Sequence, residues 1–337
     1  FTGGGGTAPY TFTYDINGGA PQIISTTGAN TTVSIAAPTN AVGSFTYSIS
    51  SLQDGTSLSC VSLSDATITI VDLPNASIAG ATAVCRNTSS PRVTFTGGNS
   101  TAPYTFTYTI NGGVNQVVSS VGGSDTVSVA APTSTSGTFS YALVSVQDGS
   151  STTCSNTAVG NTVVTINPLP TATIATSNGN ICENASSTVT FTGAVGTPPF
   201  TFTYNLNGGA TQSISTTGAN ASVSFNVANV PGTYNYNLLD VTDTYGCNQT
   251  QTGTATIVID PLPTASAGGN SSICMNGAAT VSGAGFSNGS INWVDDGTGA
   301  LTNQTTLTPT YTAGGGDAGK TVTLTMTITS TNAANPQ

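Results

Sequence analysis

The side chains in this sequence with the most varied chemistry are those of six cysteines, because thiols can bind metals, attack substrates or form disulfides. They stand at positions 60, 85, 154, 182, 247 and 274. No two of them share a CxxC spacing and the chain contains no histidine, so neither a zinc site nor a Cys-His nucleophile is expected. Disulfide bonds are the remaining role, and they place the chain in an oxidising compartment outside the cytosol.

Composition argues against an enzyme and against a nucleic-acid partner. Without histidine there is no Ser-His-Asp triad or imidazole base, and a glycosidase carboxylate pair is unsupported because Glu183 is the only glutamate. Three Lys and Arg residues against thirteen Asp and Glu give a formal charge of −10, which cannot neutralise phosphates. No apolar run is long enough to span a membrane. We therefore expect no catalytic residue, no cofactor, no nucleic-acid partner and no membrane span.

Aspartates in loops are candidate calcium ligands, because carboxylates and loop carbonyls suit that ion. The pair Asp295 and Asp296, beside Gly297, is the main candidate. The other candidates follow a long strand or lie at linkers: Asp54, Asp72, Asp148, Asp240 and Asp260. We favour a role as turn residues that accept local backbone hydrogen bonds, because no dense acidic cluster occurs.

Trp293 is the only tryptophan and has two interpretations. It could be a platform on which a sugar ring stacks. It also alternates with Ile291 on an expected strand, as a core residue of a β-sandwich does. We favour the core role.

Internal repeats organise the chain. The hexapeptide Pro-Tyr-Thr-Phe-Thr-Tyr at 9–14 returns 94 residues later at 103–108 and, with Phe for the first Tyr, at 199–204. A period of about 95 residues is the size of one β-sandwich domain. The predicted domains are repeat 1 at 1–72, repeat 2 at 73–168, repeat 3 at 169–261, and repeat 4 at 262–337.

The first and last repeats are expected to be incomplete. Residues 1–4 align with 95–98, so repeat 1 should begin inside a strand, and repeat 4 ends soon after a strand at 321–330. We expect the array to continue in both directions. Repeat 4 has Ser-Ile-Asn-Trp-Val at 290–294 in place of the aromatic strand, which indicates a related but distinct sandwich.

Alternating residues predict short strands within each repeat. In repeat 2, Tyr104, Phe106, Tyr108 and Ile110 share one face of a strand, with threonines on the other. Asn-Gly-Gly at 111–113 predicts a tight hairpin turn with positive φ. Further strands are expected at 92–96, 126–130, 138–146, 162–166 and 172–174. About seven short strands per repeat, with Gly and Pro turns and no helical period, predict an all-β fold, a tandem array of immunoglobulin-like β-sandwich domains.

The cysteines alternate between two positions in the repeat. Those before the second strand are Cys85, Cys182 and Cys274, and those after the long sixth strand are Cys60, Cys154 and Cys247. Pairing within repeats gives Cys85–Cys154 and Cys182–Cys247. Pairing across linkers gives Cys60–Cys85, Cys154–Cys182 and Cys247–Cys274. We favour the first scheme, because Cys60 and Cys274 then lack partners only where a repeat is cut short. Spacing leaves both open, since an immunoglobulin-type topology could place the two positions at opposite ends of a repeat.

Several segments resemble a known family. Ile-Cys-Glu-Asn at 181–184, Thr-Phe-Thr-Gly at 94–97, the aromatic hexapeptides and Pro-Leu-Pro-Thr-Ala between repeats resemble tandem Ig-like and PKD-like repeats of large secreted surface proteins of Bacteroidetes. These include gliding-motility adhesins exported by the type IX secretion system. Asp-Thr-Val at 125–127 is similar to the O-glycosylation pattern of Bacteroidetes, which makes Thr126 a candidate glycosylation site.

The resemblance implies an extracellular, cell-surface protein. We expect a structural repeat segment of a large surface protein, not an enzyme, that forms a rigid stalk or fibre for adhesion or motility. Its expected partners are neighbouring repeats of the same long chain, other copies of the chain, or surface glycans. Two alternatives are a polysaccharide-binding adhesin module and an accessory repeat of a secreted hydrolase.

Overall fold

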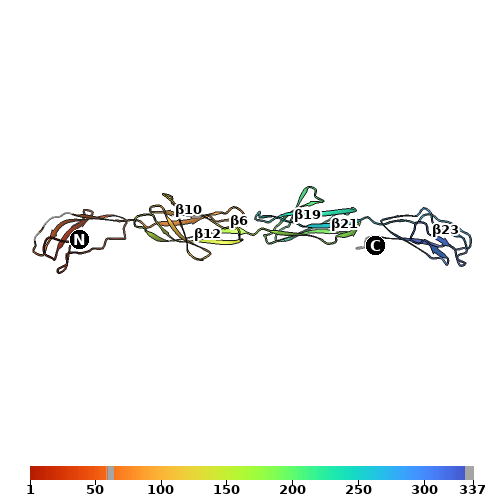
Figure 1. The fold of residues 1–337 in the computed structure, drawn as a ribbon, viewed down its shortest axis with the longest axis horizontal. Helices are drawn as coiled ribbons and strands as arrows, with labels where there is room; N and C mark the ends of the chain where they lie inside the picture. Colours follow the sequence, from red (N-terminus) through yellow and green to blue (C-terminus); the bar gives the residue numbers. More distant parts are fainter. Residues whose placement is uncertain (58, 60–63, 331–337) are drawn as a thin grey trace. The chain divides into compact units, whose positions relative to one another are not determined.

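The computed structural model describes residues 1–57, 59 and 64–330 of the chain, and every regular element within them is a β-strand (Figure 1). The predicted fold class is confirmed: the chain is a tandem array of immunoglobulin-like β-sandwiches. Within these ranges no helix has the length and apolar character needed to cross a membrane.

The chain divides into two compact units. The first contains Phe1–Ala83, Ser89–Pro132 and Thr138–Thr165. The second contains Val84–Thr88, Thr133–Gly137 and the described part of Ile166–Gln337. The second unit therefore combines short segments of repeat 2 with repeats 3 and 4.

Repeat 1, in the first unit, contains a four-stranded sheet in the order β2-β1-β3-β4. Its strands are β1 Thr11–Ile16, β2 Gln22–Ser25, β3 Gly43–Gln53 and β4 Asp65–Ile70. A short second layer faces this sheet, where Thr2 pairs with Thr32. The ring of Phe1 in that layer packs on Phe12 of β1, with 5.5 Å between ring centroids.

Repeat 2 is a sandwich of two sheets, in the orders β10-β7-β5 and β6-β12-β11-β8-β9. Figure 1 labels β6, β10 and β12. The strands are β5 Asn75–Ala79, β6 Thr82–Cys85, β7 Arg92–Gly98, β8 Thr105–Ile110, β9 Gln116–Ser119, β10 Thr126–Ala130, β11 Gly137–Gln147 and β12 Ser155–Asn167. These bounds confirm the strands that alternation predicted in this repeat.

Repeat 3, in the second unit, has the same strand order, in sheets β13-β15-β18 and β14-β21-β19-β16-β17, with β20 paired to β19. Residues of both sheets form a single buried core that includes Phe191, Phe202 and Ile257. The strands are β13 Thr171–Thr176, β14 Asn180–Cys182, β15 Thr188–Ala194, β16 Thr201–Leu206, β17 Thr211–Ser215, β18 Ser222–Asn226, β19 Gly232–Thr242, β20 Asn248–Thr250 and β21 Thr254–Asp260.

Repeat 4 differs, as its sequence predicts. Its sheets are β22-β24, β23-β27-β26 and β25-β28. Trp293 of β25 is 1% exposed and donates a hydrogen bond from Nε1 to the Thr306 carbonyl at 3.0 Å, so its core role is confirmed. The strands are β22 Thr264–Ser266, β23 Ala278–Thr280, β24 Gly285–Ser287, β25 Gly289–Asp295, β26 Ala300–Thr302, β27 Thr310–Thr312 and β28 Leu324–Ser330.

Threonine and serine hydroxyls take the place of charge on the outer faces. The outward side chains of the aromatic strand pair across to the next strand: Thr105 to Ser119 at 2.8 Å and Thr201 to Ser215 at 2.8 Å. Such cross-strand pairs each stabilise a sheet by a few tenths of a kcal/mol to about 1 kcal/mol. This explains how a chain with 5% charged residues maintains polar sheet faces.

The Asn-Gly turns adopt the predicted conformation. Asn111 and Gly112 have φ of 52° and 68°, and the Gly113 amide donates to the Ile110 carbonyl at 3.0 Å. The Asn111 side chain also accepts a hydrogen bond from the Ser140 amide at 2.8 Å, which ties the turn to β11.

A glycine at the end of the second strand leaves room for the following aromatic ring. In repeat 3 an added Cβ on Gly193 would lie 2.6 Å from Cδ2 of Phe200, which is 1% exposed. The equivalent glycines are Gly3, which faces Tyr10 in repeat 1, and Gly97, which faces Tyr104 in repeat 2. The recurring Thr-Phe-Thr-Gly and Pro-aromatic motifs are therefore one packing unit.

Replacing Gly193 with alanine is expected to destabilise repeat 3 by about 1–3 kcal/mol, because the ring must shift in a packed core. Hydrogen exchange of the β15 and β16 amides at increasing urea measures this change. Gly123→Ala is the control, since an added Cβ there contacts nothing within 4 Å and should change stability by less than about 0.5 kcal/mol. Equal effects of the two variants would contradict the packing argument.

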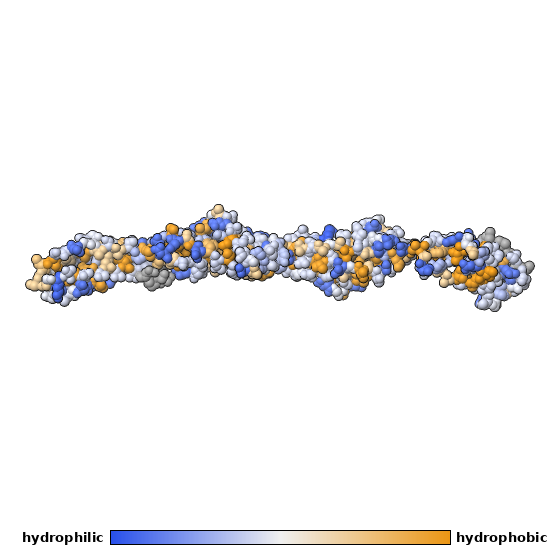
Figure 2. Space-filling view, turned by 180° about the vertical axis from the view of Figure 1, so that it is seen from behind, coloured by the Kyte–Doolittle hydropathy of each residue, from blue (hydrophilic) through white to orange (hydrophobic). Residues whose placement is uncertain are grey.

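Hydrophobic residues on the surface are scattered. On the face seen in Figure 2 they lie among hydrophilic and intermediate residues. The most exposed large ones are single valines, such as Val159 of β12 at 92% and Val114 in the loop before β9 at 82%. Single exposed residues of this kind are ordinary for protein surfaces.

Candidate functional site: a disulfide-linked joint

The second unit contains a disulfide between repeats 2 and 3. Cys85 and Cys247 are bonded, with their Cα atoms 5.4 Å apart and a sequence separation of 162. Cys85 is the last residue of β6, and Cys247 lies in the turn between β19 and β20. The bond is the most distinctive chemical feature of the described residues.

The turn after Cys85 is fixed by hydrogen bonds. The Thr88 hydroxyl donates to the Cys85 carbonyl at 2.6 Å, and Asn87 has a φ of 63°. The Arg86 amide donates to the carbonyl of Asn167, the last residue of β12, at 2.8 Å. Cys85 is therefore held at the end of repeat 2 from which the chain enters repeat 3.

The turn that carries Cys247 is organised by Asp243, which is 6% exposed. One of its carboxylate oxygens accepts hydrogen bonds from the amides of Tyr245 and Cys247, both at 3.0 Å. The other accepts from the Thr197 amide at 3.2 Å, which links this turn to the loop before β16. The carboxylate thus places the Cys247 backbone.

Strand direction explains why pairing within a repeat is wrong. In repeat 3, β14 runs parallel to β21, and Cys182 pairs with Asp260 at the end of β21. The neighbouring β19 is antiparallel to β21 and passes Thr254, at the opposite end, before it reaches Cys247. At about 3.3 Å per residue, the two cysteines are separated by roughly 20 Å or more. A disulfide requires Cα atoms within about 7 Å.

The alternative scheme across linkers is also wrong, for the same reason. Cys247 lies at the end of repeat 3 that faces repeat 2, whereas Cys274 belongs to repeat 4, which follows the other end of β21. The observed bond joins the cysteine at the exit of one repeat to the cysteine at the entrance of the next. Cys85 and Cys247 were both predicted to form disulfides, but with other partners.

Three other described cysteines lie in similar turns: Cys182 and Cys274 each begin a turn like that after Cys85, and Cys154 lies in a turn like that of Cys247. Cys154 is half-buried with its sulfur 3.3 Å from the Thr152 hydroxyl, and it is not in a disulfide. Cys182 is buried, at 1% exposure. Cys274 is exposed and is not in a disulfide. Cys60 lies outside the described residues.

The candidate calcium ligands form hydrogen bonds to turns. Asp295 accepts from the Gly297 amide at 3.1 Å, and Asp296 accepts from the Thr323 amide at 2.7 Å. Within the described residues no three acidic, cysteine or histidine side chains form a group that could hold a metal.

The aspartate equivalent to Asp54 and Asp148 in repeat 3 is Asp243 and not Asp240, which lies within β19. Burial raises the pKa of Asp148, but hydrogen bonds from Ser100 and Ser150 outweigh it and lower that pKa below its ordinary value. Asp148 therefore has the same role as Asp243: its carboxylate accepts hydrogen bonds that hold the turn in place.

A buried aspartate in repeat 4 was not singled out from the sequence. Asp317, 9% exposed, accepts hydrogen bonds from the Tyr311 hydroxyl at 2.7 Å, from the Thr298 amide at 2.9 Å and from the Gly314 amide at 2.7 Å. These bonds, that of Tyr311 above all, hold its pKa well below the ordinary value of 3.8. The available signal was Gly-Asp-Ala-Gly at 316–319, a turn with an acceptor side chain.

We expect repeat 4 to lose stability in acid through Asp317. Because its pKa is lower in the folded than in the unfolded state, its stabilisation is complete above about pH 4 and falls as pH drops toward the folded pKa. Trp293 fluorescence during thermal unfolding between pH 2 and 7 measures this. Asp317→Asn should lower the melting temperature at pH 7 and flatten its pH dependence, whereas the exposed Asp296→Asn should do neither. An unchanged pH profile in Asp317→Asn would contradict the assignment.

Thr126, the candidate glycosylation site, is exposed at the start of β10. Its amide donates a hydrogen bond to the Ser124 hydroxyl at 3.2 Å, and its own hydroxyl lies 3.5 Å from the same oxygen. Glycosylation there stays a prediction.

Comparison with family models finds no match, and comparison with curated proteins finds none either. Among solved structures, the chain is similar to a Ca²⁺-stabilised adhesin of an Antarctic bacterium, with 18% identity, TM-score 0.41, and coverage of 99% of this chain and 89% of that one. It is also similar to the fibronectin(III)-like modules of Clostridium thermocellum CbhA, with 12% identity, TM-score 0.27, and coverage of 55% and 94%. A third is the FN1–FN3 region of chicken CNTN1, with 11% identity, TM-score 0.24, and coverage of 75% and 90%. These likenesses concern the fold of repeated sandwich domains.

Proposed function

We propose that this chain is a structural repeat segment of a large extracellular surface protein, which serves as a stiff stalk or fibre in adhesion or motility. The observation that supports the proposal is the Cys85–Cys247 bond, because it joins two folded repeats covalently. A disulfide fits an extracellular location, and a joint between repeats is a mechanical feature with no role in a reaction. The resemblance to gliding-motility surface proteins of Bacteroidetes supports the same role, and export by type IX secretion is part of the proposal.

The bond changes how the chain transmits tension. When the two chain ends are pulled, force passes from Cys85 through the two sulfur atoms to Cys247 and bypasses the backbone between them. Residues 86–246, which make up most of repeats 2 and 3, cannot be extended by that force even if they unfold. A stalk built in this way keeps its length under load.

Single-molecule force spectroscopy of the full chain tests the mechanical proposal. The oxidised chain should be shorter at full extension than the Cys247→Ser chain by about 550 Å, since 162 residues are bypassed at about 3.4 Å each. Cys274→Ser is the matched control and should leave the length unchanged. Equal contour lengths of the oxidised chain and Cys247→Ser would overturn the mechanical role.

A second measurement tests the location and the partners. An antibody raised against the folded chain should label intact, unpermeabilised cells of the producing organism, and cryo-EM of the shed material should show stalks or laterally associated fibres. Neighbouring repeats, other copies of the chain and surface glycans are the proposed partners. Labelling only after permeabilisation would contradict the surface role.

A further inference from the structure

The Cys85–Cys247 bond divides the backbone of repeats 2 and 3 into two parts. Residues 75–85 contain β5 and β6, and residues 247–260 contain β20 and β21. Tension between the chain ends passes along these two segments and through the bond that joins them, and we call them the load path. Residues 86–246 form a loop that the bond closes, and tension does not pass through them. We call residues 86–246 the closed loop.

The load path lacks the residues that common proteases recognise. Proteases of the trypsin, glutamyl and chymotrypsin types cleave after Lys or Arg, after Glu, and after aromatic residues, Leu or Met. None of these residue types occurs in the load path. The closed loop contains Arg86, Arg92 and Glu183, together with every aromatic residue of repeats 2 and 3. Cleavage of these three kinds therefore falls in the closed loop.

The linkers at the two ends of the load path are protected in another way. Leu73 comes directly before Pro74, and Leu262 comes directly before Pro263. Proteases of these types do not cleave a peptide bond that precedes proline. The protected stretch therefore extends from the end of repeat 1 to the start of repeat 4.

The exposed side chains of the two repeats lie mainly in the closed loop. Tyr245, in the turn between β19 and β20, is 59% exposed and is the most exposed aromatic residue in the described part of the chain. Exposed turns are the preferred places for proteolytic nicking. The three most exposed large hydrophobic side chains that the structure describes also belong to the closed loop, and they are Val159, Val114 and Val121.

Strand pairing protects the load path further. β5 pairs with β7, and β21 lies between β14 and β19 in its sheet. Ala255, Ile257 and Ile259 of β21 are at most 3% exposed and belong to the core of repeat 3. A protease must pull a strand out of its sheet before it can cleave it, and core strands open at the highest free-energy cost.

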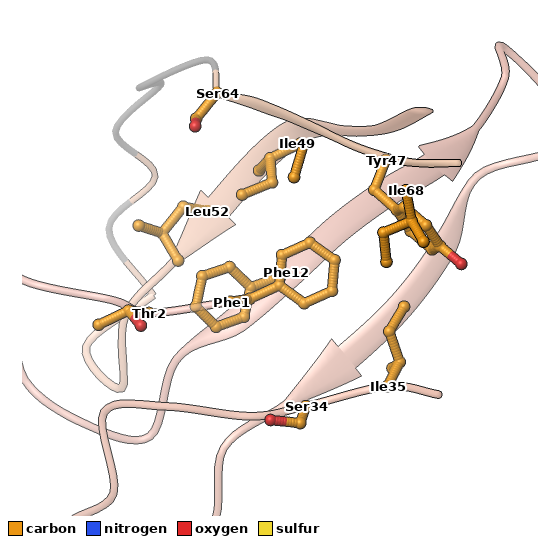
Figure 3. Close-up of a pocket in the computed structure, with 11 residues that line it drawn as sticks. Phe1, Thr2, Phe12, Ser34, Ile35, Tyr47, Ile49, Leu52, Ser64 and Ile68 are labelled. Carbon is orange, nitrogen blue, oxygen red and sulfur yellow. The ribbon is translucent and has the colours of Figure 1, made fainter. Parts of the chain in front are cut away.

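Repeat 1 has the opposite arrangement. No disulfide bypasses its backbone within the described residues, so tension passes along β1 and β3. Phe12 of β1 and Leu52 of β3 are residues that a chymotrypsin-type protease recognises, and both line an open pocket (Figure 3). A cut after either residue interrupts the line of tension.

We propose that the joint between repeats 2 and 3 is tolerant of proteolysis: proteases cut the closed loop, and the chain keeps its continuity and its length. The favoured position is the peptide bond after Tyr245. Water adds across that bond, so that Tyr245 gains a carboxylate and Gly246 gains an amine, while Cys247 stays bonded to Cys85. The inference rests on the proposed role as a stalk that carries tension.

Limited digestion of the full oxidised chain with chymotrypsin tests the proposal. We expect the first cut within repeats 2 and 3 after Tyr245. The product cut only there should run without reductant as one species, with the mass of the chain plus one water, on a denaturing gel. Reductant should split it into 1–245 and 246–337. In force spectroscopy the cut chain should keep its tether and the contour length of the uncut chain.

Three variants provide the controls. Cys247→Ser, cut at the same position, should separate without reductant and lose its tether. Met275→Phe places an aromatic residue at a 67% exposed position outside the closed loop, and a cut there should release 276–337 without reductant. Gly123→Phe adds a site in an exposed turn of the closed loop, where an added Cβ contacts nothing within 4 Å, and the cut chain should stay joined.

Two results would overturn the inference. One is a first cut within 75–85 or 247–260, and the other is separation of the cut Gly123→Phe chain without reductant. The first of these leaves the bypass of tension intact, so it contradicts the tolerance and not the stalk. Equal contour lengths of the uncut oxidised chain and Cys247→Ser contradict the stalk itself.

Discussion

Replacing Cys247 with serine is expected to lower the free energy of unfolding repeats 2 and 3 by about 4–5 kcal/mol. In the chain-entropy model a disulfide stabilises a protein by restricting its unfolded chain, and the effect grows with the length of the closed loop. Here the loop spans 162 residues, more than a whole repeat. Urea titration with hydrogen exchange of the β12 and β21 amides measures the loss.

Three variants separate the stabilisation that comes from the disulfide bond from the stabilisation that comes from packing of a cysteine side chain. Cys85→Ser should cost as much as Cys247→Ser, and the double variant should cost little more than either, since all three remove the same bond. Cys154→Ser, in an equivalent turn without a disulfide, should change stability by less than about 1 kcal/mol. Additive losses in the double variant would show that the bond does not carry the effect.

The pairing itself can be mapped with two proteases, because charged residues are so few. Cleavage after Arg86, Arg92 and Lys320 and after the single glutamate, Glu183, gives fragments 1–86, 87–92, 93–183, 184–320 and 321–337. Cys85–Cys247 joins 1–86 to 184–320 without reductant. The rejected pairing Cys85–Cys154 would join 1–86 to 93–183.

The disulfide shows which part of the site could be predicted from sequence. The spacing of the cysteines and the lack of histidine predicted disulfides at two alternating positions of the repeat. The bond between Cys85 and Cys247 joins one cysteine of each kind. The partners could not be read from spacing, because they depend on strand direction. Only the parallel pairing of β14 with β21, and the antiparallel pairing of β19, puts the two positions at opposite ends of a repeat.

Local alternation predicted the strands well because the repeats have simple two-sided patterns. The strand at 126–130 was placed at the bounds of β10, and the aromatic strand was assigned its buried face. Turn aspartates were harder. Asp243 and Asp317 are buried by contacts with loops distant in sequence, Thr197 and Thr298, so their importance has no periodic signal.

The second large effect concerns the uneven cores of repeats 1 and 3. Ile257→Ala is expected to destabilise repeat 3 by about 2–5 kcal/mol, the usual cost of truncating a buried isoleucine. The equivalent Ile68→Ala in repeat 1 should cost about 1 kcal/mol or less, because Ile68 is 42% exposed and has less surface removed from water. Urea-dependent hydrogen exchange of β21 and of β4 measures the two losses.

This difference is a property of the cover and not of the residue, which makes it testable in one molecule. Ile257 lies in one core cluster with Ile181 of β14 and with Ala172 of β13, so truncating it leaves a cavity under these strands. Ile68 has no such strands over it among the described residues, so its truncation leaves no enclosed cavity. Equal costs of Ile68→Ala and Ile257→Ala would show that the two repeats have equivalent cores in solution.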